Sequence, residues 1–507
     1  MKQLDQKNIL ILGLGASGLA LARWCVRWGA QVTVADTRAA PPQLAALQSA
    51  VPAVKFVNAA MSEALLATAA YDMVLKSPGL SPSSVAGVIR AAEAQGITCG
   101  NELSLFAQAL ADLKEERGYA PQVIAITGTN GKTTVTSLTG QLVQRAGKSV
   151  AVAGNIGPTL LDTLMEKLDE KREFAEVDVV PDLPEVWVLE LSSFQLDRVT
   201  NFEPTVATVL NVTQDHMDWH ETLAAYSAAK ARVYGSAGLM LLNRDDALVM
   251  AALPPLVKGK PLRAYLTFGG DEPQRPGDYG IETVNGMAWL VRAALADETI
   301  KRRKDEEVVL HIQRLMPLDA LRIHGRHNAT NALAALGLAL AADCALAPML
   351  HGLREYRGEP HRVESVAVVN EVEYFDDSKG TNVGATAAAL AGLGSDRKLV
   401  LILGGEGKGQ DFSLLAGPVS RYARAVVLIG RDAGLIRAAL QDRHVPLLDA
   451  ASMQEAVSVA AQQARGGDAV LMSPACASFD MFENYEHRAR VFCEAVQALG
   501  HEQGAVL

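Results

Sequence analysis

The chain has 507 residues, and since one domain usually takes roughly 150, we expect two to four domains. Its 49% hydrophobic and 21% charged residues are typical of a globular protein and exclude a disordered chain. The formal net charge of -10, and a single dense basic run (Lys301–Lys304) followed at once by acidic residues, exclude a protein built to bind a nucleic-acid backbone.

The cysteines and the apolar runs indicate the cellular compartment in which we expect the protein. The five cysteines form no CxxC pair, which disfavours both a disulfide framework and a zinc site. The first residues, Met1 to Asn8, continue into a strand-like run and not into a signal-peptide core. No apolar run reaches the roughly 20 residues that a membrane span requires. We therefore expect a cytoplasmic protein, and a monomer, that neither enters a membrane nor binds nucleic acid.

Strand-like apolar runs alternate with helical patterns from the N-terminus onward, an order that predicts parallel sheets with helices on both faces. The first set opens with a strand at Ile9–Leu12, a helix near Leu19–Trp28 and a strand at Val32–Ala35, and it fades around Gly100. We expect a Rossmann-like domain over residues 1–100.

The first turn of this set, Gly13–Gly18, has the pattern GxGxxG, and Asp36 ends the next strand. Such a loop lets the backbone approach a pyrophosphate at a helix N-terminus. A nucleotide diphosphate is the interpretation we favour, but a nicotinamide cofactor, or glycines that serve strand–helix packing alone, remain open.

The sharpest local signal, Gly128–Thr134, lies between a strand at Val123–Ile126 and a helical run at Val135–Arg145. Its glycines allow backbone N–H groups to turn toward phosphate oxygens, Lys132 supplies a charge, and Thr133 offers a hydroxyl to Mg²⁺. The first glycine of GxxxxGK[ST] is missing, so this is a shorter GxxGKT variant. The alternative is a glycine-rich turn with an exposed lysine.

Two acidic features follow in the second set. Glu190 ends the strand Val186–Leu189, and a carboxylate there is costly to bury unless it is paired or binds a cation such as Mg²⁺. The alternative is a carboxylate that caps the next turn or is solvated. Asp215 to His220 then brings together oxygen and nitrogen ligands after the strand Val206–Leu210, but no third zinc ligand lies at the usual spacing.

A polar segment, Glu355–Pro360, separates the second set from a third, which has strands at Leu399–Leu403, Ala425–Ile429 and Ala469–Met472. The fold class we predict is α/β with three domains. These are a Rossmann-like N-terminal domain (1–100), a central P-loop ATPase-like domain with a mainly parallel sheet (101–358) and a Rossmann-like C-terminal domain (359–507).

Several motifs, in the same order and over nearly the whole chain, resemble the Mur ligases of bacterial peptidoglycan synthesis. The likeness rests on Gly128–Thr134, Gly154–Gly157, Leu189–Gln195, Asn211–His216, Ala229–Lys230, Gly325–Asn331 and His361–Glu364.

Within the Mur ligases, the C-terminal runs are similar to those of the D-glutamate-adding members: Asp376–Asn382, Gly404–Lys408 and Ser473–Asp480. The Asp-Tyr-Ala-His run typical of members that add L-alanine or a diamino acid is absent. Gly380 departs from the alanine usual in the family, and we expect it to loosen its loop. Extra segments near Asp169–Pro184 and Lys301–Glu307 have no assigned role.

The resemblance implies a role for each motif. UDP would contact Gly15, Ala16, Ser17, Gly18, Asp36, Thr37, Arg38, Ser77, Pro78 and Gly79. ATP would contact Gly128, Thr129, Asn130, Gly131, Lys132, Thr133 and Thr134, and also Asn328, Asn331, Arg362 and Asp377. The muramoyl part of the substrate would contact Asn155, Gln195 and His216. The incoming amino acid would contact Lys379, Thr381, Lys408, Ser478, Phe479 and Tyr485. Metal binding would involve Thr133, Glu190, His216 and Lys230, with Lys230 carbamylated. Catalysis would involve Lys132, Glu190, His216, Lys230 and Arg362.

The implied activity is ATP- and Mg²⁺-dependent addition of D-glutamate to UDP-N-acetylmuramoyl-L-alanine, through an acyl phosphate and a tetrahedral intermediate. Two substrates and a nucleotide held on three domains also imply open and closed forms. Another Mur-type ligase or a folylpolyglutamate synthetase-like ligase is the alternative, although the latter would lack the N-terminal GxGxxG domain. A dehydrogenase would leave Gly128–Thr134 without purpose, and a nucleotide switch would bind ATP but form no amide.

Overall fold

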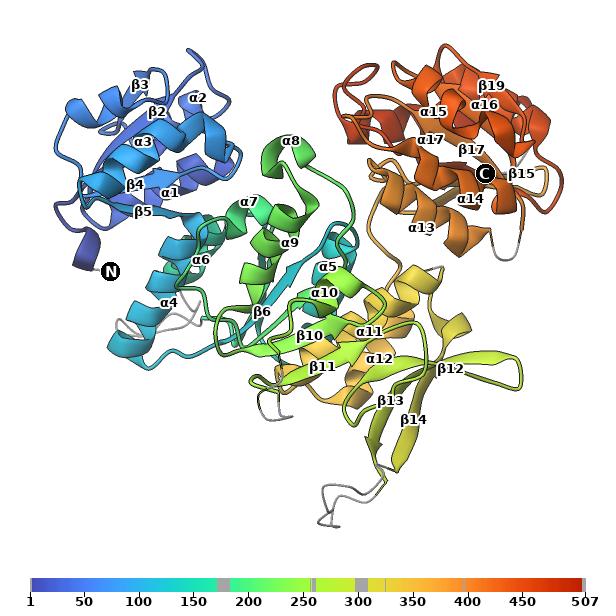
Figure 1. Ribbon diagram of the computed structural model, residues 1–507, viewed down its shortest axis with the longest axis horizontal. Coiled ribbons are helices and arrows are strands. Elements are labelled where there is room, and N and C mark those ends of the chain that lie inside the picture. Colours follow the sequence, from blue (N-terminus) through green and yellow to red (C-terminus); the bar gives the residue numbers. More distant parts are fainter. Residues whose placement is uncertain are drawn as a thin grey trace.

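The computed structural model describes residues 2–170, 183–255, 257, 261–296, 309–323, 325–394 and 397–503. They form three sheets, each packed between helices (Figure 1), which confirms the predicted α/β class with three domains. The basic run Lys301–Lys304 and most of the extra segment Asp169–Pro184 lie outside the described residues.

The N-terminal sheet is parallel throughout and has the order β3-β2-β1-β4-β5. Its strands are β1 (Asn8–Leu12), β2 (Gln31–Asp36), β3 (Lys55–Asn58), β4 (Met73–Lys76) and β5 (Thr98–Asn101), and its helices are α1 (Ala16–Arg27), α2 (Leu44–Ala50) and α3 (Pro82–Ala94). The glycine-rich turn follows the central strand β1, so it lies at the carboxyl edge of the sheet, where ligands of open α/β sheets collect.

The central sheet has nine strands in the order β14-β13-β12-β11-β10-β9-β6-β8-β7. It is parallel from β7 to β12 and antiparallel from β12 to β14. The strands are β6 (Gln122–Thr127), β7 (Val150–Gly154), β8 (Val186–Glu190), β9 (Val206–Val209), β10 (Leu239–Asn243), β11 (Tyr265–Phe268), β12 (Tyr279–Val284), β13 (Met287–Leu295) and β14 (Leu310–Pro317). The helices are α4 (Glu102–Arg117), α5 (Lys132–Arg145), α6 (Leu160–Asp169), α7 (Ser193–Leu196), α8 (Met217–His220), α9 (Leu223–Ala231), α10 (Ala247–Met250), α11 (Arg326–Ala341) and α12 (Leu346–Glu355).

The C-terminal sheet has the order β15-β16-β20-β17-β18-β19, and only its edge strand β15 is antiparallel to its neighbour. The strands are β15 (Glu364–Val369), β16 (Val372–Asp376), β17 (Leu399–Gly404), β18 (Ala423–Ile429), β19 (Leu447–Asp449) and β20 (Ala469–Met472). The helices are α13 (Val383–Leu393), α14 (Ala416–Tyr422), α15 (Ala433–Leu440), α16 (Met453–Gln463) and α17 (Tyr485–Glu502).

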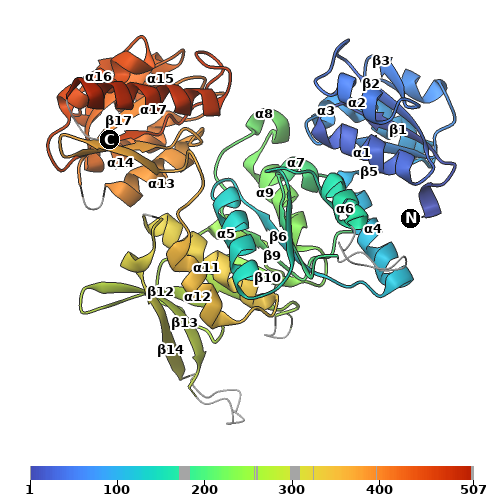
Figure 2. The same cartoon turned by 180° about the vertical axis from the view of Figure 1, so that it is seen from behind.

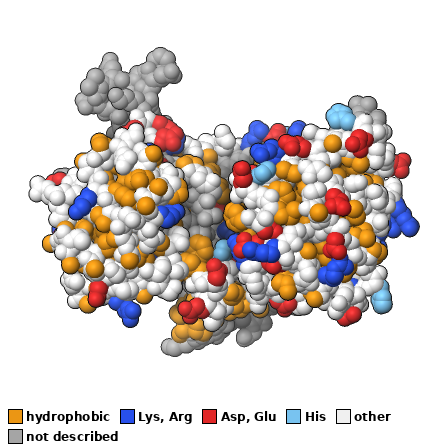
Figure 3. Space-filling model, turned by 90° about the horizontal axis from the view of Figure 1, so that it is seen from above, with side chains coloured by type: hydrophobic (Ala, Val, Ile, Leu, Met, Phe, Trp, Pro, Cys, Tyr) orange, Lys and Arg blue, Asp and Glu red, His pale blue; other side chains and the backbone are white. Residues whose placement is uncertain are grey.

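Short 3-10 helices complete the described elements: η1 (Lys2–Leu4), η2 (Glu63–Ala67), η3 (Arg232–Tyr234), η4 (Leu318–Ala320), η5 (Phe412–Leu415) and η6 (Gln441–Arg443). The two outer units sit on opposite sides of the central unit in both ribbon views, with α8 rising between them (Figures 1 and 2). Seen from above, the molecule is hollowed between these two lobes (Figure 3). No helix in the described part of the chain is long and apolar enough to cross a membrane.

Candidate active site

The phosphate loop lies between β6 and α5, in the strand–turn–helix setting that the sequence predicts. Gly131, with a φ of +82°, precedes α5, and a Cβ there would come 2.8 Å from the Asn331 Oδ1. Gly128 has a φ of +158°, and its Cβ would lie 3.0 Å from the Leu210 Cβ. Glycine at these positions therefore keeps the loop tight, and the N–H groups that open α5 are available to an anion.

Lys132 folds over this loop. Its Nζ donates to the carbonyl oxygens of Gly128 at 2.9 Å and Thr129 at 2.8 Å. Burial lowers the pKa of Lys132, while the charges of Glu190 and Asp215 oppose that shift. The ammonium group thus lies against the backbone of the loop, and phosphate oxygens would be stronger acceptors for it than the two carbonyls.

Glu190 and Lys230 lie buried beside the loop. The Glu190 Oε1 accepts from the Asn155 Nδ2 at 2.8 Å, but its Oε2 has no hydrogen-bond partner among the described residues. The Lys230 Nζ donates to the Gly128 oxygen at 2.7 Å. Burial holds the pKa of Lys230 well below its usual range, and the positive charge of Lys132 lowers it further. An unsatisfied carboxylate oxygen next to a phosphate loop fits a hard cation such as Mg²⁺.

His216 directly precedes α8 and has a left-handed conformation, with a φ of +55°. Its ring packs edge-on against Phe194, with 4.8 Å between the ring centroids, and its Nε2 lies 3.7 Å from the Asp215 Oδ2. Burial lowers the pKa of His216, against the effect of Asp215. The neutral ring is therefore favoured, which leaves a nitrogen able to accept a proton or bind a metal.

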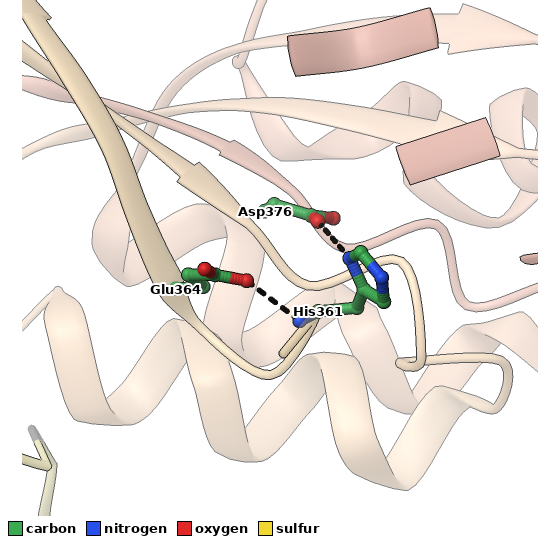
Figure 4. Close-up of side chains that lie close together, drawn as sticks. All are labelled: His361, Glu364 and Asp376. Atoms are coloured by element: carbon green, nitrogen blue, oxygen red, sulfur yellow. Dashed lines mark hydrogen bonds and ion pairs between the residues drawn. The ribbon is translucent and has the colours of Figure 1, made fainter. Parts of the chain in front are cut away.

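Arg362 reaches the phosphate loop from the start of the C-terminal unit: its Nη2 lies 2.7 Å from the Thr133 Oγ1. The flanking residues His361 and Val363 have φ values of +62° and +52°. Two contacts hold this strained turn, since the His361 Nδ1 lies 2.7 Å from the Asp376 Oδ2 and its backbone N–H donates to Glu364 at 2.9 Å (Figure 4).

One group of described side chains is close enough together to hold a metal ion, and it consists of His361, Glu364 and Asp376. Their polar atoms already bond to one another (Figure 4), so we assign them to the support of Arg362. The sequence singled out Arg362 but gave no role to His361 and Glu364, although both belong to the His-Arg-Val-Glu motif.

Further residues join the central and C-terminal units. The side-chain amides of Asn130 and Asn382 bond to each other at 3.0 and 3.3 Å. Asn331 donates to the Asn328 Oδ1 at 3.1 Å, next to Gly131. Asp377 is buried and accepts from the Ser473 Oγ at 2.6 Å, and burial raises the pKa of Asp377 to about 7. The residues predicted to contact ATP thus come from both units.

Two of the residues predicted to contact the amino acid, Lys379 and Tyr485, lie together at the start of α17. The Lys379 Nζ sits 3.6 Å from the ring centroid of Tyr485, and burial, with the charge of Arg362, lowers the pKa of Lys379 to about 8. Ser478 is buried, whereas Phe479 is 66% exposed. Lys408 is exposed and has a φ of +51°.

Two loops of this region are held together by Arg488, which the sequence did not single out. Its guanidinium is buried and donates to the Ser378 oxygen, the Ser378 Oγ and the Cys476 oxygen at 2.8 to 3.0 Å. Gly380 does not lie in a loose loop as we expected, because its N–H donates to the Asp377 oxygen at 2.8 Å and its own oxygen accepts from Ala475 at 2.9 Å.

The N-terminal unit brings its predicted residues together at the carboxyl edge of the sheet. A Cβ on Gly18 would lie 2.1 Å from the Gly13 oxygen, so α1 can pack this closely only with glycine. Asp36 accepts from the Leu14 N–H at 2.8 Å and pairs with Arg38, which lowers the pKa of Asp36 to about 2. Ser77 follows β4 and contacts the same turn, since a Cβ on Gly13 would lie 3.1 Å from its Cβ.

A separate cavity of about 1150 Å³ lies on the other side of this unit, between α3, β5, α4 and the segment Asp197–Asn201. Its lining includes none of the predicted site residues among those described. The predicted residues instead lie on all three units, at the glycine-rich turn before α1, at the loop before α5 and near the start of α17.

Family models match most of the chain. The Mur ligase MurD-like N-terminal domain matches residues 7–100, the Mur ligase middle domain residues 126–339, and the Mur ligase glutamate ligase domain residues 361–476. The chain is 66% identical to the UDP-N-acetylmuramoylalanine–D-glutamate ligase of Albidiferax ferrireducens, with 100% of this chain and 99% of the relative covered. It is 61% identical to the enzyme of the same name from a Polaromonas species, over 100% of both chains.

Solved structures with the same fold include the UDP-N-acetylmuramate–alanine ligase MurC from Thermotoga maritima, with a TM-score of 0.53 and 20% identity over 97% of this chain and 100% of that one. MurF ligase from Thermotoga maritima in complex with ADP has a TM-score of 0.55 and 14% identity over 98% of this chain and 97% of that one. At these identities the likeness concerns the fold alone.

Proposed function

The chain belongs to the Mur ligase family, and we propose that it uses ATP to join D-glutamate to UDP-N-acetylmuramoyl-L-alanine in peptidoglycan precursor synthesis. Its full-length relatives carry the name of this activity, at 55–66% identity. The single structural observation that best supports it is the placement of Arg362 on Thr133, which completes a phosphate site from two units.

A carboxylate is a poor acceptor for an amine, because resonance and negative charge both resist attack. In the proposed reaction an oxygen of the L-alanyl carboxylate attacks the γ-phosphorus of ATP in line, ADP leaves, and an acyl phosphate forms. Lys132 and Arg362 sit where negative charge is redistributed in this step, and they offset it from fixed positions.

In the second step the amine of glutamate attacks the acyl carbon, and the tetrahedral intermediate collapses with loss of phosphate to leave an amide. The ammonium of glutamate must first lose a proton. His216 and the adjacent Asp215 are the groups we propose for this role, since the neutral imidazole is favoured at that position.

Mg²⁺, when bound, would neutralise phosphate charge and orient the reacting oxygens. Glu190, with its unsatisfied Oε2, and Thr133 are the residues proposed to hold it, with His216 nearby. Lys230 has a buried amine with a depressed pKa, the state that reacts with CO₂, and its carbamate would supply a further oxygen ligand.

The glutamate site is proposed to lie at Lys379, Thr381, Lys408, Ser478, Phe479 and Tyr485. A dicarboxylate suits this region because Lys379 and Lys408 carry positive charge and Arg488 is buried behind the loops. The uridine diphosphate would occupy the N-terminal cluster around Gly15–Gly18, Asp36 and Ser77. Since the two substrates and the nucleotide are proposed to bind on three different units, we infer that the units close during turnover.

We further propose the division 1–100, 101–358 and 359–507, and a monomer that acts in the cytoplasm. One chain carries all three proposed sites, and the five cysteines are free, as a reducing compartment would leave them.

Phosphate release tests the function. The purified chain would receive ATP, Mg²⁺, UDP-N-acetylmuramoyl-L-alanine and one amino acid at a time, with D-glutamate, L-glutamate, L-alanine and a diamino acid as the panel. We expect turnover with D-glutamate, its loss in Lys132→Ala and its retention in Lys114→Ala, which changes an exposed lysine. Turnover with L-alanine or the diamino acid but not D-glutamate would contradict the assignment.

A further inference from the structure

The N-terminal and central units are joined at one peptide bond without a linker, because β5 ends at Asn101 and α4 begins at Glu102. Both side chains are buried, with 7% and 1% of their surface exposed. Buried polar groups are costly unless they bind a partner, so the partners of these two residues indicate what the junction holds in place.

The oxygen and the nitrogen of the Asn101 side-chain amide bind different partners. Its Oδ1 accepts from the Ser104 N–H at 3.0 Å and caps α4. Its Nδ2 donates to the backbone oxygens of Gln195 at 2.9 Å and Asp197 at 3.3 Å, at the end of α7. One side chain thus ties the last strand of the N-terminal sheet to the segment that carries Gln195, which is proposed to face the muramoyl part of the substrate.

Glu102 points to a second segment of the central unit. Its Oε1 accepts from the Leu161 N–H at 3.1 Å, at the start of α6 and a few residues after Asn155. Burial raises the pKa of Glu102 above its ordinary value, against the opposing effect of Ser17 and the start of α6. Its Oε2 has no partner of hydrogen-bond geometry within the described chain.

The N-termini of three helices therefore meet at one buried carboxylate. These helices are α1, whose second residue is Ser17, α4, which Glu102 itself begins, and α6. Partial positive charge at helix N-termini favours an anion at such a position. Ser17 belongs to the loop proposed to bind UDP, whereas α6 directly follows the turn that carries Asn155.

Other contacts also join the two units. Arg198 pairs with Glu93 at the surface, and such an exposed pair fixes geometry weakly, because solvent screens it and both side chains must be ordered. Lys76 is buried and lies 3.4 Å from Asp197, and apolar side chains of α1, α4 and α6 share one core. Asn101 and Glu102 add buried, directional hydrogen bonds to these contacts.

We propose that Asn101 and Glu102 are positioning residues that set the separation between the UDP loop and the two segments that face the muramoyl group. This inference rests on the proposed function, since it concerns the same substrate. A UDP-sugar bound at one end by the N-terminal unit delivers its carboxylate to the phosphate loop only if this separation is right. A small misplacement of a reacting group carries a large cost in rate.

The test uses a substitution that retains the helix cap. Asn101→Asp keeps an N-cap oxygen for α4 but places a second oxygen against the carbonyls of Gln195 and Asp197. Glu102→Gln keeps the size of the side chain and removes its charge. Glu115→Gln, on the exposed face of the same helix, is the matched control. Binding of UDP alone and of UDP-N-acetylmuramoyl-L-alanine is measured by calorimetry for each protein, together with its Tm.

UDP alone contacts one unit and the whole substrate contacts both. We expect Asn101→Asp to weaken binding of the whole substrate about tenfold, as the loss of one buried hydrogen bond implies, with the Kd of UDP unchanged. Glu102→Gln, which also lies beside Ser17 of the UDP loop, should weaken binding of the whole substrate more than binding of UDP. An equal loss for both ligands, or no loss for either, would overturn the proposal. Failure of the wild-type chain to bind the UDP-sugar would instead count against the proposed function, and would be seen before any variant is made.

Discussion

The guanidinium of Arg362 lies 2.7 Å from the Thr133 hydroxyl, although the two residues are 229 positions apart. This contact joins the central and C-terminal units at the proposed phosphate site. It also means that the geometry of Arg362 depends on the turn that precedes β15, where two residues adopt the left-handed conformation.

Arg362→Lys should lower kcat about 100-fold, because lysine keeps the charge but loses the planar fork that can bond to Thr133 and phosphate oxygens together. Steady-state phosphate release measures the effect. Arg354→Lys, on the exposed face of α12, serves as the control and should retain wild-type kcat. Equal rates for Arg362→Lys and the control would show that the interdomain contact has no catalytic role.

His361→Ala should lower kcat about tenfold, since the loss of its bond to Asp376 frees the turn that aims Arg362. The effect should not add to that of Arg362→Lys, because both changes act through one guanidinium. A double variant whose loss in kcat equals the product of the single losses would contradict this explanation.

Lys230 should react with CO₂. Its pKa is well below the usual range, so a larger fraction of the amine is neutral and nucleophilic near pH 7 than for an exposed lysine. Removal of CO₂ from the buffer should reduce activity and bicarbonate should restore it. With ¹³C-bicarbonate, a carbamate signal should appear in the wild type and be absent from Lys230→Ala. The idea fails if Lys230→Ala keeps both the signal and the activity.

The KM for D-glutamate should rise at alkaline pH. The pKa of Lys379 is lowered to about 8, so its ammonium is charged below that pH and lost above it. KM should increase about fivefold between pH 8 and pH 9, because the charged fraction of Lys379 falls from about a half to about a tenth. Lys379→Arg stays charged throughout and controls for titration of glutamate itself, so its KM should change less over the same range. Parallel profiles would exclude Lys379 as the titrating group.

Asp377→Asn should stabilise the protein at pH 8. The folded-state pKa of about 7 is above the ordinary value near 3.8, so ionisation of Asp377 costs stability as the pH rises through this window. Removal of the charge should gain roughly 1–4 kcal/mol above pH 7, and the gain should vanish toward pH 4. Urea unfolding at both pH values measures it. The same variant should bind ATP more weakly, and a gain of equal size at pH 4 would refute the assignment to charge.

The parts of the site that the sequence predicted are those with local signals. Gly131 has a φ of +82° before α5, and Gly18 packs against the Gly13 oxygen. Each glycine is required by the geometry of a single turn, so the spacing of glycines in the sequence predicts both turns. The alternation of strands and helices predicted three sheets for a similar reason, since periodicity is local. The helix after the phosphate loop begins at Lys132 and not at Val135, because Gly131 already ends the turn.

What the sequence did not indicate depends on distant partners. In the sequence Arg488 looks like any other helical arginine, because only the fold places Ser378 and Cys476 around it. Asn101 and Glu102 resemble a routine helix start, and their bonds to Gln195 and Leu161 join segments that are 94 and 59 positions away. The antiparallel extension from β12 to β14 was also not predicted.

We propose that ATP activates the L-alanyl carboxylate as an acyl phosphate at the loop Gly128–Thr134. This proposal is tested most directly with UDP-N-acetylmuramoyl-L-alanine that carries ¹⁸O in both carboxylate oxygens, followed by mass analysis of the released phosphate. The mechanism predicts one ¹⁸O atom in each phosphate and one in the amide of the product. Phosphate without the label would show that the carboxylate never attacked ATP and would contradict the mechanism.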